Sequence, residues 1–367
     1  GQPRFEYEPT GDRGAKGLLL ESSSTNLARY SSAVDSWGNS ANRTVSSNAA
    51  VAPDGSLTAD LVVPTSTSGI HYVGDFSVSI TSGTTYTGSV YVRDAGQRYV
   101  QIVGDSSVFG TGVYVNFDLN DGTYAATGCT ATATSVGNSW WRLTVTAAAT
   151  STGTGNLAIA FGTSKLNGRL PSFSGNDYDG VLVWGFQFEQ SSFPSSYIAT
   201  SGSASTRTAD SLSVATADIP GFSEGVGTIV CETGGVASST VGNQLAFGLN
   251  GPASSNQFSA GVNAGGVSDS TVRVYSQTPA GDQAFLNPGT ATVGAGYKLA
   301  CRYELDNIAA SMNGGTVVSD TSGQVPVGID TLWIGELDGN YHINSNIKRI
   351  ALYSEALTDT ELQSLTS

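Results

Sequence analysis

One stretch of alternating apolar and polar residues, TGVYVNFDLNDG at positions 111–122, decides the fold class of this chain. Val113, Val115 and Phe117 alternate with Tyr114 and Asn116, which is the period of a half-buried β-strand. The closing Asn-Asp-Gly supplies residues that tolerate positive φ, so a tight hairpin should follow. The stretch therefore predicts antiparallel strands.

Similar short stretches, each ended by a Gly, Ser, Asn or Asp break, recur along most of the chain without a sustained helical period. In the first half they predict strands at 69–80, 84–93, 98–104, 111–119, 140–147, 156–162 and 181–190. In the second half they predict strands at 227–233, 243–250, 257–263, 271–277, 297–304, 309–313, 331–335 and 347–353. We therefore predict an all-β chain with two antiparallel β-sandwich or jelly-roll domains.

Local signals and a change of composition complete the predicted organisation. Asn313-Gly314 predicts another hairpin, and Thr358 with Glu361 forms the Thr-x-x-Glu capping box of one short C-terminal helix. Residues 199–218 lose the aromatic side chains and the alternation, which is typical of a domain junction. We expect an N-terminal arm over residues 1–26, a sandwich over 27–198, a linker over 199–218 and a second sandwich over 219–367.

The composition excludes several function classes. Lys and Arg number 16 against 30 Asp and Glu, so the net charge of −14 argues against binding nucleic acid through its phosphates. Only 13% of the residues are charged and 46 are Gly, so Ser, Thr, Asn and Gly must form most of the surface. No apolar run is long enough to span a bilayer and no signal-peptide pattern is present, so we expect no membrane insertion.

Two further observations concern the beginning of the chain and its cysteine residues. The chain begins Gly-Gln-Pro-Arg without Met, and we expect a fragment whose upstream part is missing. Cys129, Cys231 and Cys301 are too few for a disulfide-stapled scaffold, and we expect them to be free and mostly buried.

Seven short motifs in the first half carry a family resemblance. They are PRFEYEP (3–9), KGLLLE (16–21), TNL (25–27), NAAVAPDG (48–55), WWR (140–142), WGFQFE (184–189) and FPSSYI (193–198). Together they resemble a family of bacteriophage tail-fibre and other tail-appendage proteins. The resemblance implies that the first sandwich is a jelly roll similar to family 4/9 carbohydrate-binding modules.

The second half carries a broader resemblance. ASMNGG (310–315) and IKRIALY (347–353), followed by LTD (357–359) and EL (361–362), resemble laminin-G or concanavalin A-like sandwiches. Together the resemblances imply a phage tail fibre in the virion that adsorbs to a bacterial capsule or lipopolysaccharide. They also imply a homotrimer joined to other tail proteins through the missing N-terminal part. Three alternatives stay open: a capsule-degrading depolymerase or lyase, a structural spacer without receptor binding, and a secreted bacterial glycan-binding module.

The alternation also gives a candidate carbohydrate-binding face on one sheet of the first sandwich. The side chains predicted to point into the core are Val90, Val92, Val100, Ile102, Val113, Val115 and Phe117. The outward side chains are then Tyr91, Arg93, Tyr99, Gln101, Tyr114 and Asn116, a mixture of aromatic and polar groups suited to a sugar. Trp140 joins them because it shares a face with Arg142, whereas Trp141 and Trp184 are expected in the core. The alternative is a solvated outer face or a contact with another subunit.

No catalytic pattern is complete. Concanavalin-like enzymes that cut β-glucans carry Glu-x-Asp-x-Glu on one strand, because period 2 places all three acids on one face. The stretches Glu304-Leu-Asp and Glu336-Leu-Asp both lack the third acid. His71 and His342 lie in no metal-binding or nucleophile pattern, so we expect a protein that is not an enzyme.

No cofactor is required by any motif. Asp177 and Asp179, with Asn176 beside them, offer oxygen ligands for a structural Ca²⁺. The alternative reading of this Asn and Asp cluster is a simple turn.

Overall fold

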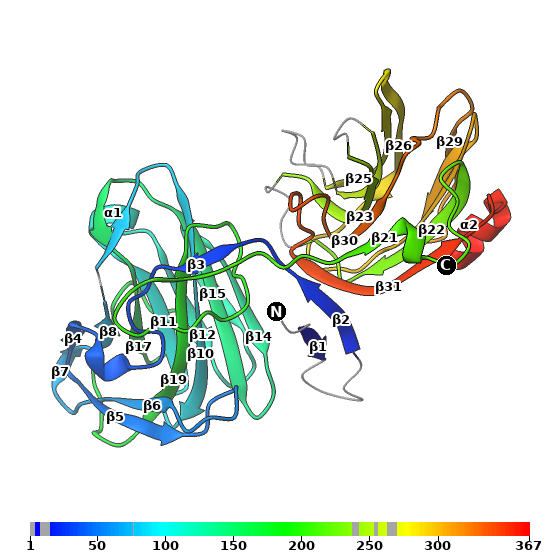
Figure 1. Ribbon diagram of the computed structural model, residues 1–367. Helices are drawn as coiled ribbons and strands as arrows, with labels where there is room; N and C mark the ends of the chain where they lie inside the picture. The colour runs from blue at the N-terminus through cyan, green and yellow to red at the C-terminus, as the bar shows by residue number, and fades with distance from the viewer. Residues whose placement is uncertain (1–3, 8–14, 76, 237–241, 253–255, 263–269) are drawn as a thin grey trace. The chain divides into compact units, whose positions relative to one another are not determined.

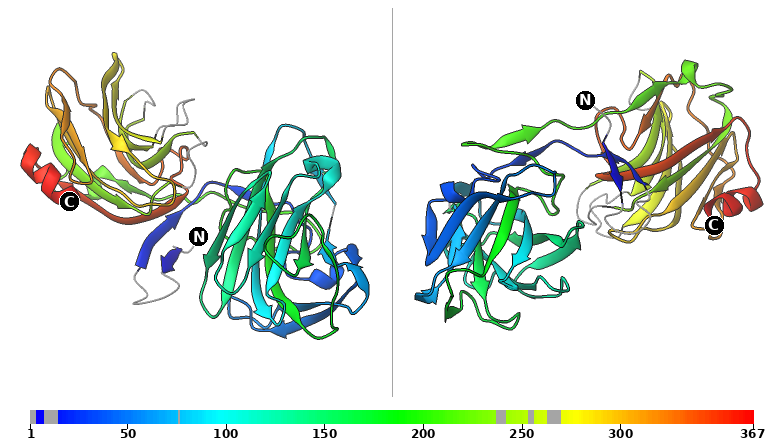
Figure 2. Two further views of the ribbon diagram at one scale, coloured as in Figure 1. Left: turned by 180° about the vertical axis from the view of Figure 1, so that it is seen from behind. Right: turned by 90° about the horizontal axis from the view of Figure 1, so that it is seen from below.

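The computed structural model describes residues 4–7, 15–75, 77–236, 242–252, 256–262 and 270–367 (Figure 1). The chain divides into two compact units. We call Ser24–Arg207 the continuous unit, and Gly1–Ser23 together with Thr208–Ser367 the split unit. Each is a β-sandwich with its own core, as the alternation predicted, and Figure 2 shows both from two further directions.

The continuous unit consists mainly of two six-stranded sheets within the described residues. The first contains β5 (Arg43–Ala50), β6 (Ala59–Pro64), β10 (Thr85–Ala95), β14 (Thr130–Ser135), β15 (Trp140–Ala148) and β19 (Gly180–Glu189), in the order β14-β15-β10-β19-β6-β5. The second contains β4 (Asn39–Ala41), β8 (Tyr72–Gly74), β11 (Tyr99–Gly104), β12 (Tyr114–Asp118), β13 (Tyr124–Thr127) and β17 (Leu157–Gly162), in the order β13-β12-β11-β17-β8-β4. The short elements are β3 (Ser24–Asn26), β7 (Ser68–Ile70), β9 (Val78–Ile80), β16 (Gly153–Gly155), β18 (Ser172–Ser174), β20 (Ser205–Arg207), η1 (Val34–Ser36) and α1 (Ser106–Phe109).

The core of the continuous unit lies between these two sheets. The predicted inward side chains are all buried, with no more than 5% of any surface exposed: Val90, Val92, Val100, Ile102, Val113, Val115 and Phe117. The predicted hairpin is confirmed, because β12 pairs antiparallel with β13 and Gly122 between them adopts φ 73°.

The split unit also packs two antiparallel sheets against each other. The first contains β1 (Phe5–Tyr7), β2 (Ala15–Leu20), β22 (Val226–Thr233), β27 (Lys298–Glu304), β28 (Ile308–Met312), β29 (Val318–Asp320) and β31 (Ser345–Tyr353), in the order β1-β2-β31-β22-β27-β28-β29. The second contains β21 (Ser213–Ala215), β23 (Gln244–Asn250), β24 (Gln257–Val262), β25 (Thr271–Thr278), β26 (Gly281–Thr290) and β30 (Thr331–Ile334), in the order β21-β30-β23-β24-β25-β26. The remaining elements are η2 (Thr216–Asp218) and α2 (Asp359–Thr366).

The beginning of the chain belongs to the split unit, which differs from the N-terminal arm expected over residues 1–26. Strand β2 pairs with β31, more than three hundred residues further along the chain, and Leu20 is 4% exposed in the core of this unit. The Arg4 guanidinium lies 2.7 Å from the Glu21 carboxylate and also binds Asp210. Strand pairing and apolar burial thus make the first residues part of the second sandwich, because β31 needs a neighbour on its outer edge.

The expected linker over residues 199–218 is likewise divided between the two units. Strand β20 pairs with β3 in the continuous unit, and β21 pairs with β30 in the split unit. In the sequence, the loss of aromatic residues marked this segment as a junction. In the structure, strand pairing orders its first part in the continuous unit and its second part in the split unit.

The predicted C-terminal helix is confirmed. The Thr358 hydroxyl accepts a hydrogen bond from the backbone N–H of Glu361, and the Glu361 carboxylate accepts one from the backbone N–H of Thr358 at 2.8 Å. Leu362 is fully buried against Val230 and Ala300, so the helix covers the outer side of the first sheet of the split unit.

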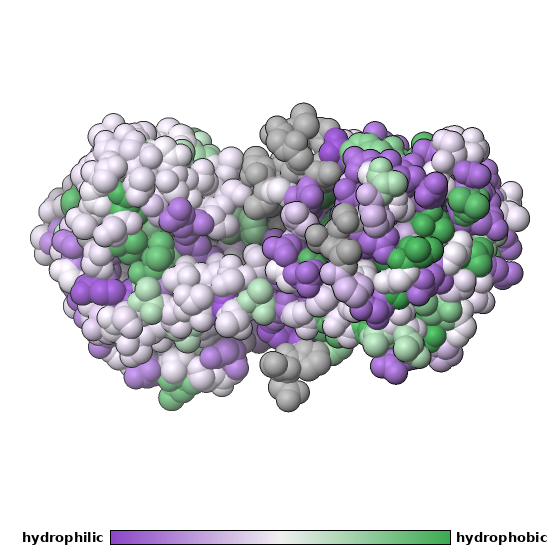
Figure 3. Space-filling view, turned by 45° about the horizontal axis from the view of Figure 1, so that its top comes forward, coloured by the Kyte–Doolittle hydropathy of each residue, from purple (hydrophilic) through white to green (hydrophobic). Residues whose placement is uncertain are grey.

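The surface agrees with the composition. Large areas of the face in Figure 3 are pale, the shade of Ser, Thr and Gly residues. Among the described residues, no helix has the length and apolar character needed to cross a membrane. The three cysteines are free, with Cys231 and Cys301 buried and Cys129 half-buried, as predicted.

Candidate functional site

The predicted carbohydrate-binding face does not lie on one sheet. Strand β10 pairs with β15 and β19, whereas β11 pairs with β12 and β17. The first sheet therefore carries Tyr91, Arg93 and Trp140, and the second carries Tyr99, Gln101, Tyr114 and Asn116. The prediction of a single face was wrong because alternation sets which way a side chain points, not which strands become neighbours.

On the first sheet, the aromatic side chains are covered by neighbouring residues. Trp140 was expected to be accessible but is only 2% exposed, in a small cluster with Trp184 and Ala59. The ring of Tyr91 lies 5.2 Å from that of Trp184, and the Arg93 guanidinium lies 5.3 Å from the Trp140 ring. These side chains form a small apolar cluster in which Trp140 and Trp184 are buried and Tyr91 is half-buried.

On the second sheet, the two amides bind protein groups. Gln101 is fully buried and Asn116 is 3% exposed. The Gln101 amide donates to Asn116 Oδ1 at 2.8 Å and to the carbonyl of Gly168 at 3.0 Å, and Asn116 donates to the carbonyl of Asn167 at 2.7 Å. These bonds fasten the loop that contains Asn167, while Tyr99 and Tyr114 remain half-buried. The amides thus have a structural role.

The candidate calcium ligands stabilise turns. Asp177 accepts a hydrogen bond from the backbone N–H of Ser66 at 2.9 Å, and bonding to Ser66 lowers the pKa of its carboxyl group. Asp179 accepts a bond from the Asn176 amide at 2.6 Å. Within the part of the chain that the structure describes, no group of three or more His, Cys, Asp and Glu residues is placed to hold a metal ion.

The two partial acid motifs have structural partners as well. Glu336 is 1% exposed and accepts hydrogen bonds from the backbone N–H groups of Leu212 and Gly339 at 3.0 and 2.9 Å. Glu304 accepts a bond from Asn307 at 2.7 Å, and Asp306 adopts φ 56° in the turn that follows β27. Glu336 and Glu304 are thus both engaged by neighbouring protein groups.

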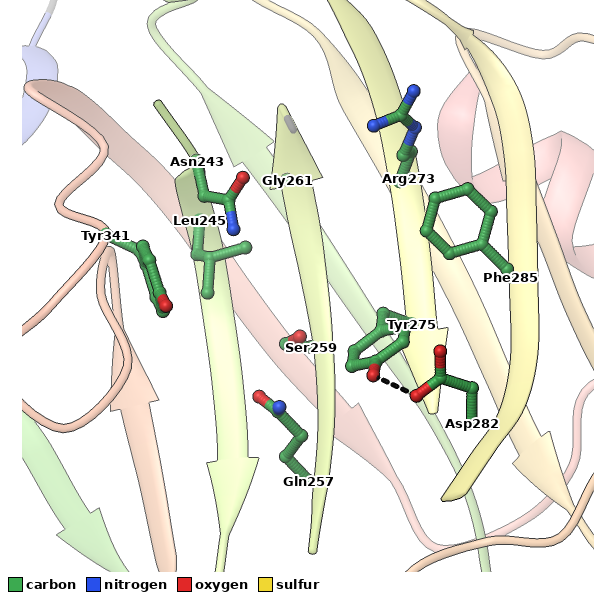
Figure 4. A pocket seen from close by; sticks show the side chains of 10 residues that line it. All are labelled: Asn243, Leu245, Gln257, Ser259, Gly261, Arg273, Tyr275, Asp282, Phe285 and Tyr341. Carbon is green, nitrogen blue, oxygen red and sulfur yellow. Dashed lines mark hydrogen bonds between the residues drawn. The ribbon is translucent and has the colours of Figure 1, made fainter. Parts of the chain in front are cut away.

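The outward face of the second sheet of the split unit carries a cleft of about 390 Å³, which lies in the range of small-molecule sites (Figure 4). Four adjacent strands and the loop after β30 supply its lining. The lining residues are Asn243, Leu245, Gln257, Ser259, Gly261, Arg273, Tyr275, Asp282, Phe285 and Tyr341.

Alternation positions the side chains of the cleft. In β25 Val272 and Val274 are fully buried in the core, which turns Arg273 and Tyr275 outward. Strand register then places Ser259 of β24 opposite Tyr275 and Tyr275 opposite Phe285 of β26. An apolar inner face thus dictates a mixed aromatic and polar outer face.

The floor of the cleft depends on a glycine. A Cβ atom placed on Gly261 would lie 2.2 Å from the carbonyl oxygen of Gln244 and 2.5 Å from the Cα of Leu245, both backbone atoms of the neighbouring strand. The pairing of β23 and β24 shifts register between Leu245 and Phe247, which brings the two backbones this close. Gly261 is therefore required for the close packing of β23 and β24 at the floor of the cleft.

One wall of the cleft consists of Tyr275 and Phe285. Their ring centroids are 6.2 Å apart in an edge-to-face arrangement, and the Arg273 guanidinium lies 5.0 Å from the Phe285 centroid. The Tyr275 hydroxyl donates a hydrogen bond to Asp282. Burial, together with the nearby Asp282 carboxylate, raises the pKa of Tyr275 to about 12, so the phenol keeps its proton at neutral pH.

The opposite wall is Tyr341, which lies across Leu245 and Ser259 from the first wall (Figure 4). Its side chain is 49% exposed and its backbone adopts φ 59°, an uncommon conformation for an aromatic residue. Reciprocal backbone bonds between Leu337 and Asn340, both 2.9 Å, and a 2.8 Å bond from the Leu245 N–H to the Tyr341 carbonyl hold the loop. A bulky residue keeps a left-handed backbone conformation only where the surrounding structure enforces it, and such residues are often found at binding sites.

The cleft combines two aromatic walls with amide side chains and with one positive and one negative side chain, Arg273 and Asp282. The Gln257 amide donates to Gln277 at 3.0 Å, and Gln277 donates to Asp282 at 3.3 Å. Of the described residues that line the cleft, Asp282 alone is a carboxylate, so this lining lacks the pair that a glycosidase needs. The arrangement suits recognition of a ligand with apolar ring faces and hydroxyl groups.

None of these lining residues was among the expected site residues. The signal was present in the sequence as Arg273-Val-Tyr275 and Gln257-Phe-Ser259, where aromatic or polar side chains alternate with apolar ones. Tyr341 gave no such signal, because its role depends on the loop conformation and on the distant strand that it faces.

Comparison with known proteins gives remote structural similarities only. No protein-family model matches the chain, and no curated protein matches it. The CBM40 module of the Ruminococcus gnavus IT-sialidase is 16% identical, with a TM-score of 0.35 over 43% of this chain and 93% of that chain. The same module bound to α2,3-sialyllactose is 15% identical with a TM-score of 0.34 over the same shares, 43% and 93%. Domains LG4-5 of the mouse laminin α1 chain are 12% identical with a TM-score of 0.28, over 98% of this chain and 96% of that chain. Scores this low carry no ligand over to this chain, so its ligand class is inferred from its own residues.

Proposed function

We propose that this chain is the receptor-binding part of a bacteriophage tail fibre, located in the virion, which adsorbs to a bacterial capsule or lipopolysaccharide without cleaving it. The observation that carries the proposal is the cleft over β23–β26, where exposed aromatic side chains flank a floor of small and amide side chains. Aromatic rings stack on the apolar faces of sugar rings, and amides bind the hydroxyl groups. The tail-fibre role and the homotrimer rest on the family resemblance of the motifs in residues 3–198.

The chemistry of the cleft favours binding over cleavage. Tyr275, with a pKa raised to about 12, holds its proton too firmly to serve as a general base near pH 7. Its hydroxyl is engaged by Asp282, which also accepts a bond from Gln277. A rigid set of side chains that are already bonded to one another suits recognition more than proton transfer.

The test is a binding measurement on a panel of purified bacterial capsules and lipopolysaccharides, with the chain in its native oligomeric state. We expect saturable binding to at least one of them, with no shortening of the polysaccharide on a sizing column. Tyr341→Ala and Phe285→Ala should each weaken binding by about tenfold, the usual loss for a central aromatic contact. Tyr178→Ala is the matched control, because Tyr178 is 72% exposed but lies in the continuous unit.

Three other outcomes of this binding measurement would contradict the proposal or part of it. Absence of binding to every polysaccharide would refute the proposal and favour a structural spacer. Release of oligosaccharides would identify a depolymerase or lyase. Binding that survives both cleft substitutions in folded protein would place the receptor site on another surface.

A further inference from the structure

Strand β14 lies at the end of the first sheet of the continuous unit, and β15 is its one neighbour in that sheet (Figure 1). Its six residues, TATATS, pair with β15 without any shift of register, from Thr130 opposite Thr146 to Ser135 opposite Trp141. Among the described residues, the backbone of β14 forms hydrogen bonds to β15 alone. The N–H and C=O groups that point away from β15 therefore form an open row along the edge of the sheet.

The other edge strands of the four large sheets have features that discourage pairing, and β14 has none of them. Edge strands of folded proteins are commonly protected by being short, by charged residues or proline, or by an irregular register. Strands β1, β4, β13, β21 and β29 have only three or four residues each. Strand β5 contains Arg43 and an irregular register. Strand β26 contains Asp282 and Pro288 and pairs with β25 through two shifts of register.

The stretch of sequence that contains β14 is uncharged. No Asp, Glu, Lys or Arg occurs between Asp121 and Arg142, in a chain whose net charge is −14. The alanine side chains of β14 pack against the core, whereas its threonine side chains are exposed. Two copies of an acidic chain repel each other where their charged surfaces meet, but the residues of this edge bring no like charges together. The edge therefore suits contact with a second copy of the chain.

The alternating sequence of β14 also fits a second copy of itself. In an antiparallel pair, side chains directly opposite each other point to the same face of the sheet. When two copies of β14 pair around a two-fold axis at Thr132, Thr130 of each copy lies opposite Thr134 of the other. Threonine then faces threonine on the outer face of the sheet, which is a favourable cross-strand pair, and alanine faces alanine on the inner face.

We propose that β14 is an interface between copies of this chain, in which two β14 strands pair antiparallel and join the first sheets of two continuous units into one sheet. The contact has two-fold symmetry, so it joins copies in pairs and is additional to the contacts of the homotrimer proposed above. The proposed polysaccharide cleft lies in the split unit, so pairing and polysaccharide binding are tested separately.

The experiment measures the mass of the purified chain by sedimentation over a range of concentrations. We expect the unmodified chain to contain an even number of copies. Thr132→Lys should halve that number and raise the dissociation constant of the pair by about tenfold or more, because two lysines then meet at the two-fold axis. Thr132→Glu should have the same effect. An equal mixture of the two variants should recover the paired mass, since opposite charges then face each other.

Thr44→Lys is the matched control, because Thr44 is exposed on β5, the opposite edge of the same sheet, and its replacement should leave the mass unchanged. Thermal melts show whether each variant is folded. Hydrogen exchange of the unmodified chain gives a second readout, since the amides of β14 should exchange more slowly at concentrations where pairs form.

Three results would each overturn the inference. They are an odd number of copies in the unmodified chain, an unchanged mass of folded Thr132→Lys, and exchange of the β14 amides that does not depend on concentration. A mixture of the Lys and Glu variants that stays unpaired would also contradict pairing at Thr132. Absence of polysaccharide binding in a paired chain would overturn the proposed function alone.

Discussion

Replacing one leucine near the beginning of the chain should destabilise the end of the chain. Leu20 in β2 is 4% exposed and belongs to the core of the split unit. A Cβ placed on Gly335 would lie 2.5 Å from Leu20 Cδ1, and the N–H of Ile343 bonds to the Gly335 carbonyl at 2.8 Å. Leu20 therefore packs directly beneath the base of the loop that carries Tyr341.

Leu20→Ala removes three carbon atoms from a site that is closed on all sides. Leucine to alanine changes in such sites cost about 2–5 kcal/mol of unfolding free energy. A value of about 3 kcal/mol corresponds to a melting temperature lower by about 6–12 °C for a unit of this size. Calorimetry should show this shift in one of two transitions, and hydrogen exchange should rise in β22 and β31 but not in β10 and β19.

The control is Leu305→Ala, because Leu305 lies in the same unit but is 61% exposed, so its removal should change little. Leu20→Ala should also weaken polysaccharide binding, because the loop that carries Tyr341 loses the side chain packed beneath its base. Equal exchange in both units, or no change in either, would refute the assignment of the first residues to the split unit.

Two further predictions test the cleft floor and an ion pair. Gly261→Ala should destabilise the split unit by about 1–3 kcal/mol and weaken polysaccharide binding, because the new Cβ meets backbone atoms of β23; Gly225→Ala, with open space around it, is the control in thermal melts. In the continuous unit, Arg98 donates two hydrogen bonds of 2.6 Å to Asp118, which lowers the pKa of the Asp118 carboxyl group. A lowered folded-state pKa stabilises the fold above the ordinary value of about 3.9, and the stabilisation is lost as the pH falls through the folded-state value. Asp118→Asn should therefore reduce the loss of stability of this unit in melts between about pH 5 and pH 2, and an unchanged acid profile would contradict the role of the pair.

Local patterns were sufficient for the all-β class and for the inner faces of the strands that they predicted, but they did not predict strands such as β6 (Ala59–Pro64), β14 (Thr130–Ser135) and β26 (Gly281–Thr290). The side chains predicted to be inward, such as Val92 and Val115, are buried because period 2 is a property of each strand alone. The same holds for the hairpin at Gly122 and for the capping box at Thr358, whose partners lie within a few residues. These features depend on short-range geometry, so a short window of sequence contains the necessary information.

The candidate site depended on contacts that no short window contains. Tyr91 and Tyr99 look equivalent in sequence but lie on different sheets, and Trp140 is buried in a cluster with residues from other parts of the chain, such as Ala52. The cleft likewise requires four strands in a particular register and Tyr341 from a loop more than fifty residues beyond them.

The sequence by itself determined that this chain is all-β and which side chains of the predicted strands face inward. It also determined where the hairpin at Gly122 and the C-terminal helix lie. Only the tertiary structure decided that the first residues complete the last sandwich and that Arg273, Tyr275, Phe285 and Tyr341 share one cleft. The physical reason is that alternation chooses the face of each strand locally, whereas the choice of neighbouring strand depends on burying the whole apolar face at once, and that choice builds the site.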